Sequence, residues 1–155
     1  MSSRKHISGK PIEVPSRGSP VNSFPSVTTA NSLARVVALD PPTITRLART
    51  RTVDLVTIGR HSGQLRRVEI WWFHFEDRFI VTGTPGRRDW YANVLANPNV
   101  AIETRHGDFP GLARVVTDFE FRHRFFMDWA AMWYSIQSQL KALQDTAPMI
   151  EIVLA

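Results

Sequence analysis

The chain has 155 residues, of which 43% are hydrophobic and 10% aromatic, and this is enough for one domain with a buried core. It has no cysteine, which excludes disulfides, thiolate nucleophiles and cysteine-based metal sites, so we expect any redox chemistry to come from a bound cofactor. No apolar run approaches the ~20 residues of a membrane span, and the N-terminus lacks the apolar centre of a signal peptide. We therefore expect no transmembrane segment and a cytoplasmic protein.

The positive charge is concentrated near the N-terminus. Residues 1–32 carry Arg4, Lys5, Lys10 and Arg17 against Glu13, which gives +3 of the total net charge of +5 and leaves +2 for the rest. A nearly neutral body argues against nucleic acid as a partner. The first 30 residues are rich in Ser, Pro and Gly, which predicts a flexible basic tail (1–30) followed by one domain (31–155).

The pattern of apolar residues predicts hairpin-linked strands with short helices between them. We expect helices over Ser32–Leu39, Pro41–Arg49 and Asp89–Ala96, a helix opened by a capping box at Thr117 and Glu120, and a last amphipathic piece around Leu140 and Leu143. The capping-box helix has an apolar stripe of Phe121, Phe125, Trp129, Met132 and Trp133, with Arg122 on its exposed side. We expect strands over Val53–Ile58, Leu65–Phe75, Arg78–Thr82, Val100–Arg105, Leu112–Thr117 and Met149–Leu154.

Strands that follow one another in hairpins, without βαβ units, favour a mainly β fold built on a small six-stranded antiparallel barrel with flanking helices. The centre of the longest strand, Ile70-Trp71-Trp72-Phe73, is apolar without alternation, so both of its faces should be covered. The covering element is either a helix or a second subunit, and a homodimer is therefore one expectation.

Two glycine-broken turns that carry arginines follow apolar strands. The first is Gly59-Arg60-His61-Ser62-Gly63, and the second is Gly83-Thr84-Pro85-Gly86-Arg87-Arg88. Glycines let backbone N–H groups approach phosphate-type oxygens, hydroxyls can donate to them, and guanidinium groups bind them bidentately. If Leu65–Phe75 and Arg78–Thr82 pair around Glu76-Asp77, the register brings residues 84–87 beside residues 66–69. The two turns together predict one anion-binding site.

Motifs for the common hydrolase, zinc, nucleotide and Rossmann sites are absent: there is no G-x-S-x-G, H-E-x-x-H, Walker loop or G-x-G-x-x-G. The five histidines form no i, i+4 pair on a helix, so no metal site is predicted. We expect His74 to be a hydrogen-bonded core residue. His61 lies inside the first turn, where it either contacts an anion or faces solvent.

The same residues resemble a known family. The segment Thr57–Arg66, the hairpin after it, Gly83-Thr84-Pro85-Gly86, and the run from Trp90-Tyr91 through Asn93 to Pro98 are similar to the deazaflavin-dependent nitroreductases and quinone reductases, within the flavin-binding split β-barrel superfamily. The similarity is dense from about Val53 to Glu103. It implies an FMN-binding split-barrel type of fold and an oxidoreductase that binds reduced coenzyme F-420, or alternatively FMN, and passes a hydride to a small organic acceptor.

The resemblance also implies which residues contact the cofactor. Arg60, His61, Ser62 and Arg66 match the first turn and its motif arginine, Arg67, Val68 and Ile70 follow along the strand, and the later segments contribute Thr82, Gly83, Thr84, Pro85, Trp90, Tyr91 and Asn93. Many relatives have proline where this chain has Glu69, whose carboxylate would repel an anion unless an arginine pairs with it.

Alternative functions remain open at this stage. The first is an FMN-dependent reductase or oxidase on the same barrel, and the second is a protein that binds flavin or a haem-like ligand without turnover. A basic module that uses its tail on nucleic acid is a third. The acceptor of the hydride, for example a quinone, an enone or a nitro compound, cannot be chosen from the residues.

Overall fold

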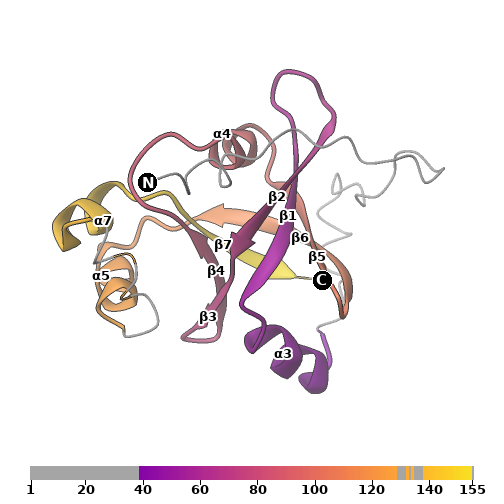
Figure 1. Cartoon of the computed structure of the whole chain (residues 1–155), viewed down its shortest axis with the longest axis horizontal. Coiled ribbons are helices and arrows are strands. Elements are labelled where there is room, and N and C mark those ends of the chain that lie inside the picture. Colours follow the sequence, from indigo (N-terminus) through magenta and orange to yellow (C-terminus); the bar gives the residue numbers. More distant parts are fainter. Residues whose placement is uncertain (1–38, 129–131, 133, 135–137, 155) are drawn as a thin grey trace.

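The computed structural model describes residues 39–154 except 129–131, 133 and 135–137 (Figure 1). The predicted tail (1–30) and nearly all of the predicted helix Ser32–Leu39 lie outside the described residues, as do Trp129 and Trp133. Within the described part of the chain, no helix is both long and apolar enough to cross a bilayer.

The described residues contain one seven-stranded sheet with helices against it (Figure 1). The strands are β1 (Thr52–Ile58), β2 (Leu65–Trp71), β3 (Phe73–Phe75), β4 (Arg78–Thr82), β5 (Asn99–Thr104), β6 (Gly107–Val115) and β7 (Met149–Leu154). The helices are α3 (Pro41–Ala48), α4 (Asp89–Ala96), α5 (Phe119–Met127) and α7 (Leu140–Thr146).

The sheet has the order β2-β1-β5-β6-β7-β4-β3, and all neighbouring strands are antiparallel. The edge strands β2 and β3 are separated in sequence by Trp72 alone, so the sheet must curl until its two edges meet at this residue. Some Cα atoms of β2 and β4 lie within 8 Å of each other. No ladder joins these two strands in the described residues. The barrel is therefore closed at the Trp72 end and split between β2 and β4 at the other end.

The seventh strand is a correction to the predicted count of six, because the predicted strand Leu65–Phe75 is interrupted. At Trp72 the backbone N–H donates to Arg51 O at 2.8 Å, and the indole Nε1 donates to Leu47 O of α3 at 3.0 Å. The buried Trp72 ring stacks on Phe79 with 4.8 Å between centroids. The apolar run is thus the point at which the chain passes from one sheet edge to the other.

The predicted hairpin around Glu76-Asp77 is confirmed for its β3–β4 part. Both turn residues have positive φ angles, 51° and 62°, and Phe73 pairs with Ile80. The predicted continuation of this ladder to residues 66–69 and 84–87 is wrong, because the partners of β4 in the described residues are β3 and β7, and β2 lies at the opposite edge of the sheet beside β1. The turn after β5 also differs, since Thr104 pairs with Gly107 and β6 begins there, earlier than the predicted Leu112.

Two apolar clusters hold the molecule together. The first fills the barrel interior and includes residues of α3 and α4, so these helices close the barrel from either end (Figure 1). The second lies on the outer side of β3, β4 and β7, under α5 and α7. α5 begins at Asp118, whose carboxylate accepts from Glu120 N at 3.0 Å and Phe121 N at 3.3 Å, so this residue caps the helix in place of the predicted Thr117.

Arg122 of α5 is buried, which contradicts its predicted place on the exposed side of the helix. Its guanidinium donates to four backbone oxygens, those of Val116, Leu143, Gln144 and Ala147, at 2.6–3.1 Å. Burial lowers the pKa of Arg122. The arginine joins α5 to the C-terminal turn of α7, where the last carbonyls of a helix have no partner within the helix itself.

Candidate functional site

The β1–β2 turn forms a tight loop at the split end of the barrel. Gly59 N donates to Gln64 O at 2.7 Å, and Gly63, at φ 73°, donates to Gly59 O at 2.8 Å. A Cβ at Gly59 would lie 2.7 Å from Ser62 Oγ, so this close approach requires glycine. Ser62 Oγ accepts from Arg66 Nη2 at 3.3 Å, while His61 at the tip is exposed.

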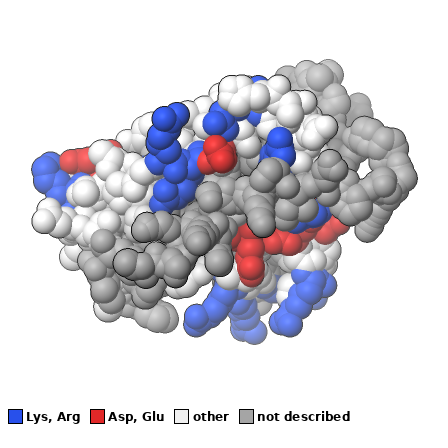
Figure 2. Space-filling view, turned by 45° about the horizontal axis from the view of Figure 1, so that its top comes forward, with Lys and Arg blue, Asp and Glu red and all other residues white. Residues whose placement is uncertain are grey.

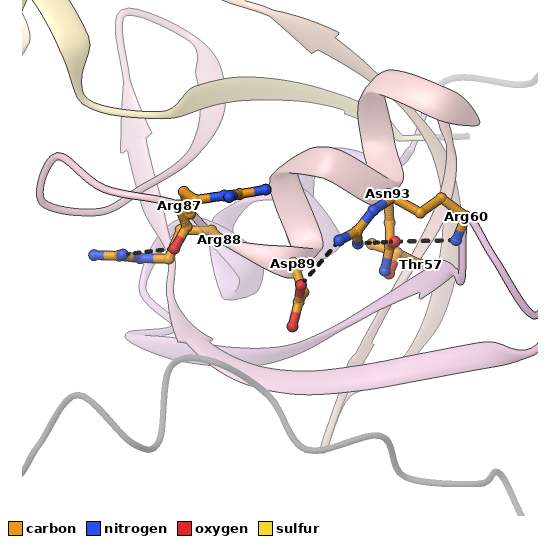
Figure 3. A network of polar contacts seen from close by, with 6 residues as sticks. All are labelled: Thr57, Arg60, Arg87, Arg88, Asp89 and Asn93. Atoms are coloured by element: carbon orange, nitrogen blue, oxygen red, sulfur yellow. Dashed lines mark hydrogen bonds and ion pairs between the residues drawn. The ribbon is translucent and has the colours of Figure 1, made fainter.

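Arg60 links the β1–β2 turn to the first turns of α4 by hydrogen bonds and an ion pair (Figure 3). Its backbone N and its Nη1 both donate to Asn93 Oδ1, at 3.1 and 2.9 Å, and its Nη2 pairs with Asp89 at 3.2 Å. The buried Asn93 also donates from Nδ2 to Thr57 Oγ1 at 3.1 Å. The loop 83–88 leads directly into α4, so this network brings the two arginine-bearing turns to one end of the barrel, as the sequence predicted, although by a route other than the predicted register.

Arg66 occupies the barrel mouth. It is paired across the ladder with Thr57, and it shares the inner face of β2 with Val68 and Ile70. Within the described residues, no acidic side chain pairs with Arg66, so this part of the chain does not neutralise its charge.

The second loop follows β4 at the same end. Thr82 is buried and its Oγ1 donates to Pro148 O at 2.6 Å, so its hydroxyl serves the fold. Gly83 is buried, and Thr84 and Pro85 are half-buried. Arg88 Nη2 donates to both Thr84 O and Thr84 Oγ1, at 3.0 and 2.9 Å (Figure 3 shows Arg88 at the start of α4).

Trp90 and Tyr91 stand in the first turn of α4. Trp90 is 3% exposed and packs into the barrel cluster, and Tyr91 lies against that cluster with its ring 5.8 Å from Trp90 in an edge-on arrangement. The Trp90 Nε1 is buried without a hydrogen-bond partner in the described residues. Such a donor is unusual, because buried polar groups are normally paired.

Three of the predicted cofactor contacts on β2 do not lie with the others at the barrel mouth. Val68 and Ile70 are 7% and 5% exposed and belong to the barrel core, while Arg67 points to the opposite face of β2 from Arg66. Arg67 pairs there with Glu103 at 2.7 Å. Glu69 lies on the same outer face, so its carboxylate does not face the barrel mouth.

That outer face carries a row of directly opposed carboxylates, from Glu69 through Asp54 and Glu103 to Asp108. Burial and the charge of Glu69 raise the pKa of Asp54, and the charge of Arg67 opposes the shift. The sheet thus separates an acidic outer side from the basic mouth.

The mouth itself is positively charged. The view that brings this end forward shows basic side chains close to an acidic one near its centre, with further acidic side chains at the left and below the centre (Figure 2). Of the arginines in the two turns, only Arg60 has an acidic partner among the described residues, and Arg66, Arg87 and Arg88 have none. No group of histidine, aspartate or glutamate able to hold a metal occurs in the described part of the chain.

The structure gives roles to residues that were not among the predicted cofactor contacts. Asp89 and Thr57 complete the Arg60 network, and Arg88 organises the second loop. Tyr134 donates from its hydroxyl to Thr82 O at 3.4 Å, and burial raises its pKa, against the opposing charge of Arg88. In the sequence, Asp89 stands out by its place at the start of a predicted helix alone. No local pattern marks Tyr134 as part of the site, because its contact with Thr82 spans 52 positions.

A curled antiparallel sheet that is split between two of its strands and flanked by helices defines the class of split-barrel proteins. Residues 31–151 match the family described as F420H(2)-dependent quinone reductase, and the chain belongs to this family. The family consists of oxidoreductases, and its cofactor is coenzyme F-420.

Solved structures share the fold at low sequence identity. An F420-H2 dependent reductase is 22% identical, with 76% of this chain and 99% of that chain covered at a TM-score of 0.51. A FAD-binding protein from Mesorhizobium loti is 16% identical, with 76% and 91% covered at 0.54. The heme storage protein HutZ from Vibrio cholerae is 17% identical, with 77% and 92% covered at 0.53. These likenesses confirm the split-barrel fold and do not distinguish among its ligands.

Proposed function

We propose that this protein binds reduced coenzyme F-420 at the barrel mouth and promotes hydride transfer to a small organic acceptor, such as a quinone, an enone or a nitro compound. The observation that carries the proposal is the pair of arginines, Arg66 and Arg88, that converge at one end of the barrel without acidic partners among the described residues. A protein keeps such charges when a ligand supplies the counter-charge.

The residues at the mouth fit an anionic cofactor. Ser62 and Thr84 supply hydroxyls, Arg66 supplies a fork that suits phosphate or carboxylate, and the start of α4 adds the partial positive charge of a helix N-terminus. The buried, unpaired Nε1 of Trp90 is a further donor at the first turn of that helix. We include His61, Pro85 and Tyr91 in the proposed site because they flank these groups in sequence.

When bound, the reduced deazaflavin supplies the hydride, and the acceptor also takes up a proton. The protein has to orient the ring, hold its anionic part and keep water from the reacting faces. The Arg60–Asn93 network links the first turn to α4, while Val68 and Ile70 anchor β2 in the core. Arg60 and Asn93 are therefore positioning residues in this proposal, because their polar groups are occupied by each other.

Turnover of reduced F-420 under anaerobic conditions, followed by deazaflavin absorbance, tests the proposal. We expect oxidation with at least one of a quinone, an enone or a nitroaromatic compound to be faster with the protein than without it. If F-420 binds but the protein does not accelerate its oxidation with any of these acceptors, the alternative of a ligand-binding protein without turnover replaces this proposal. If FMN binds and turns over while F-420 does neither, the FMN-dependent alternative replaces it.

A further inference from the structure

The loop 83–88 is folded around its own last side chain. Arg88 Nη2 holds Thr84 O and Oγ1 at 3.0 and 2.9 Å, and Nη1 donates to Arg87 O at 3.0 Å. Gly86, at φ 138°, leaves room for the guanidinium, since a Cβ there would lie 3.2 Å from Nη1. The conformation of this loop therefore depends on Arg88.

No acidic side chain in the described part of the chain compensates the charge of Arg88. The side chain is half-buried, burial lowers the pKa of its guanidinium, and its Nε is buried with no hydrogen-bond partner in the described residues. Arg122 offers a contrast, because four backbone oxygens surround its guanidinium and it joins two helices. Among the described residues, Arg88 instead bonds to atoms of its own loop alone, so its positive potential stays at the barrel mouth.

The hydrogen bond from Arg88 limits the direction in which the hydroxyl proton of Thr84 can point. A hydroxyl can accept and donate at once, and Thr84 Oγ1 already accepts from Arg88. The hydroxyl proton must then point away from the guanidinium, and it has no acceptor in the part of the chain that the structure describes. The loop thus presents a fixed O–H donor beside an unneutralised cation, which is the arrangement that a phosphate oxygen binds best.

We infer that Arg88 is the positioning residue of the phosphate site: from behind the loop it directs the Thr84 hydroxyl to the phosphate of the cofactor and so favours phosphorylated deazaflavins over unphosphorylated ones. The inference rests on the proposed binding of F-420 and adds to it a residue and a selectivity. Arg88 acts through Thr84, so the two side chains form one unit and their contributions to binding are not independent.

Fluorescence titration tests the inference with two probes, F-420 and the deazaflavin riboside that lacks the phosphate. The variants are Arg88→Gln, Thr84→Val, the double variant, and Arg105→Gln as a control, since the exposed Arg105 lies in the turn between β5 and β6 and outside the two arginine-bearing turns. We expect each single variant to weaken F-420 about tenfold, and the double variant to be weaker than the worse single variant by no more than about threefold. Riboside affinity should stay within about threefold of wild type in all variants, as should F-420 affinity in the control.

Additive losses in the double variant would show that Arg88 does not act through Thr84, and equal losses for both probes would show that no phosphate is selected. Either result overturns the inference while the proposed function stands. A wild-type protein that does not bind F-420 overturns the proposed function itself. If thermal unfolding without cofactor shows that Arg88→Gln is not folded, Thr84→Val and Arg88→Lys decide, and both must then lose F-420 affinity without losing riboside affinity.

Discussion

Arg66 and Arg67 are adjacent in sequence and have opposite roles, because successive side chains of a strand point to opposite faces. Arg67 is neutralised by Glu103 on the outer face, whereas Arg66 stands at the barrel mouth beside Ser62. The sequence assigned both to the cofactor, and strand alternation alone could not say which one faces the site. The same alternation places Glu69 on the outer face with Arg67, so its carboxylate does not repel an anion at the barrel mouth.

The exposed Arg105, in the turn between β5 and β6, is the matched control for Arg66, because both substitutions to alanine remove one positive charge. Arg66→Ala removes a charge-assisted contact worth about 1.5–3 kcal/mol, so we expect F-420 binding to weaken roughly ten- to over a hundredfold. Arg66→Lys keeps the charge but loses the fork, and an intermediate loss should appear in the same fluorescence titration.

For Arg105→Ala we expect F-420 affinity within about threefold of wild type. Equal losses for Arg66→Ala and Arg105→Ala would mean that only net charge matters, and the specific site at the barrel mouth would have to be abandoned. Thermal unfolding without cofactor should leave both variants close to wild type.

Among the elements, the α5–α7 pair depends most on one buried charge. Arg122→Met fills a similar volume but removes the donor of the Val116, Gln144 and Ala147 oxygens, whereas Leu143 O keeps its hydrogen bond from Ala147 N. Each unsatisfied buried group costs about 1–3 kcal/mol, so we expect the free energy of unfolding to fall by at least about 3 kcal/mol. Denaturant unfolding measures this loss.

Arg124 of the same helix provides the comparison, because its partner Glu76 is exposed and Arg124→Met should change stability far less. A similar small change in both variants would contradict the structural role given to Arg122. The sequence predicted Arg122 to be exposed because arginine is seldom fully buried. No local pattern shows that the C-terminal turn of α7 packs against this side chain.

Most elements were predictable because their signals are local. α4 over Asp89–Ala96 and β7 over Met149–Leu154 lie where the sequence placed them, since an acidic helix start and an apolar run directly after a proline are readable within a few positions. The break at Trp72 was not predictable, because an uninterrupted apolar run is compatible with one long strand. The exchange of partners there depends on Leu47 and Arg51, which are more than 20 positions away in sequence.

At the scale of the whole molecule, the curled sheet accounts for the site. The chain passes between the two edges at Trp72 and closes one end, so the loops after β1 and β4 are left together at the other end. The sequence predicted this convergence from a hairpin register, whereas the structure achieves it through the Arg60–Asn93 contact with α4. The homodimer stays a prediction, although Trp71, 43% exposed on the edge strand β2, is a surface that a second copy could cover.

The central claim is that this barrel mouth binds the deazaflavin F-420, and side-by-side fluorescence titration of the purified full-length protein with F-420 and FMN tests it most directly. We predict a dissociation constant for F-420 in the micromolar range or below, about 8 kcal/mol or more of binding free energy, and binding of FMN at least about tenfold weaker. Failure of both ligands to bind below about 100 μM, or tighter binding of FMN than of F-420, would contradict the account.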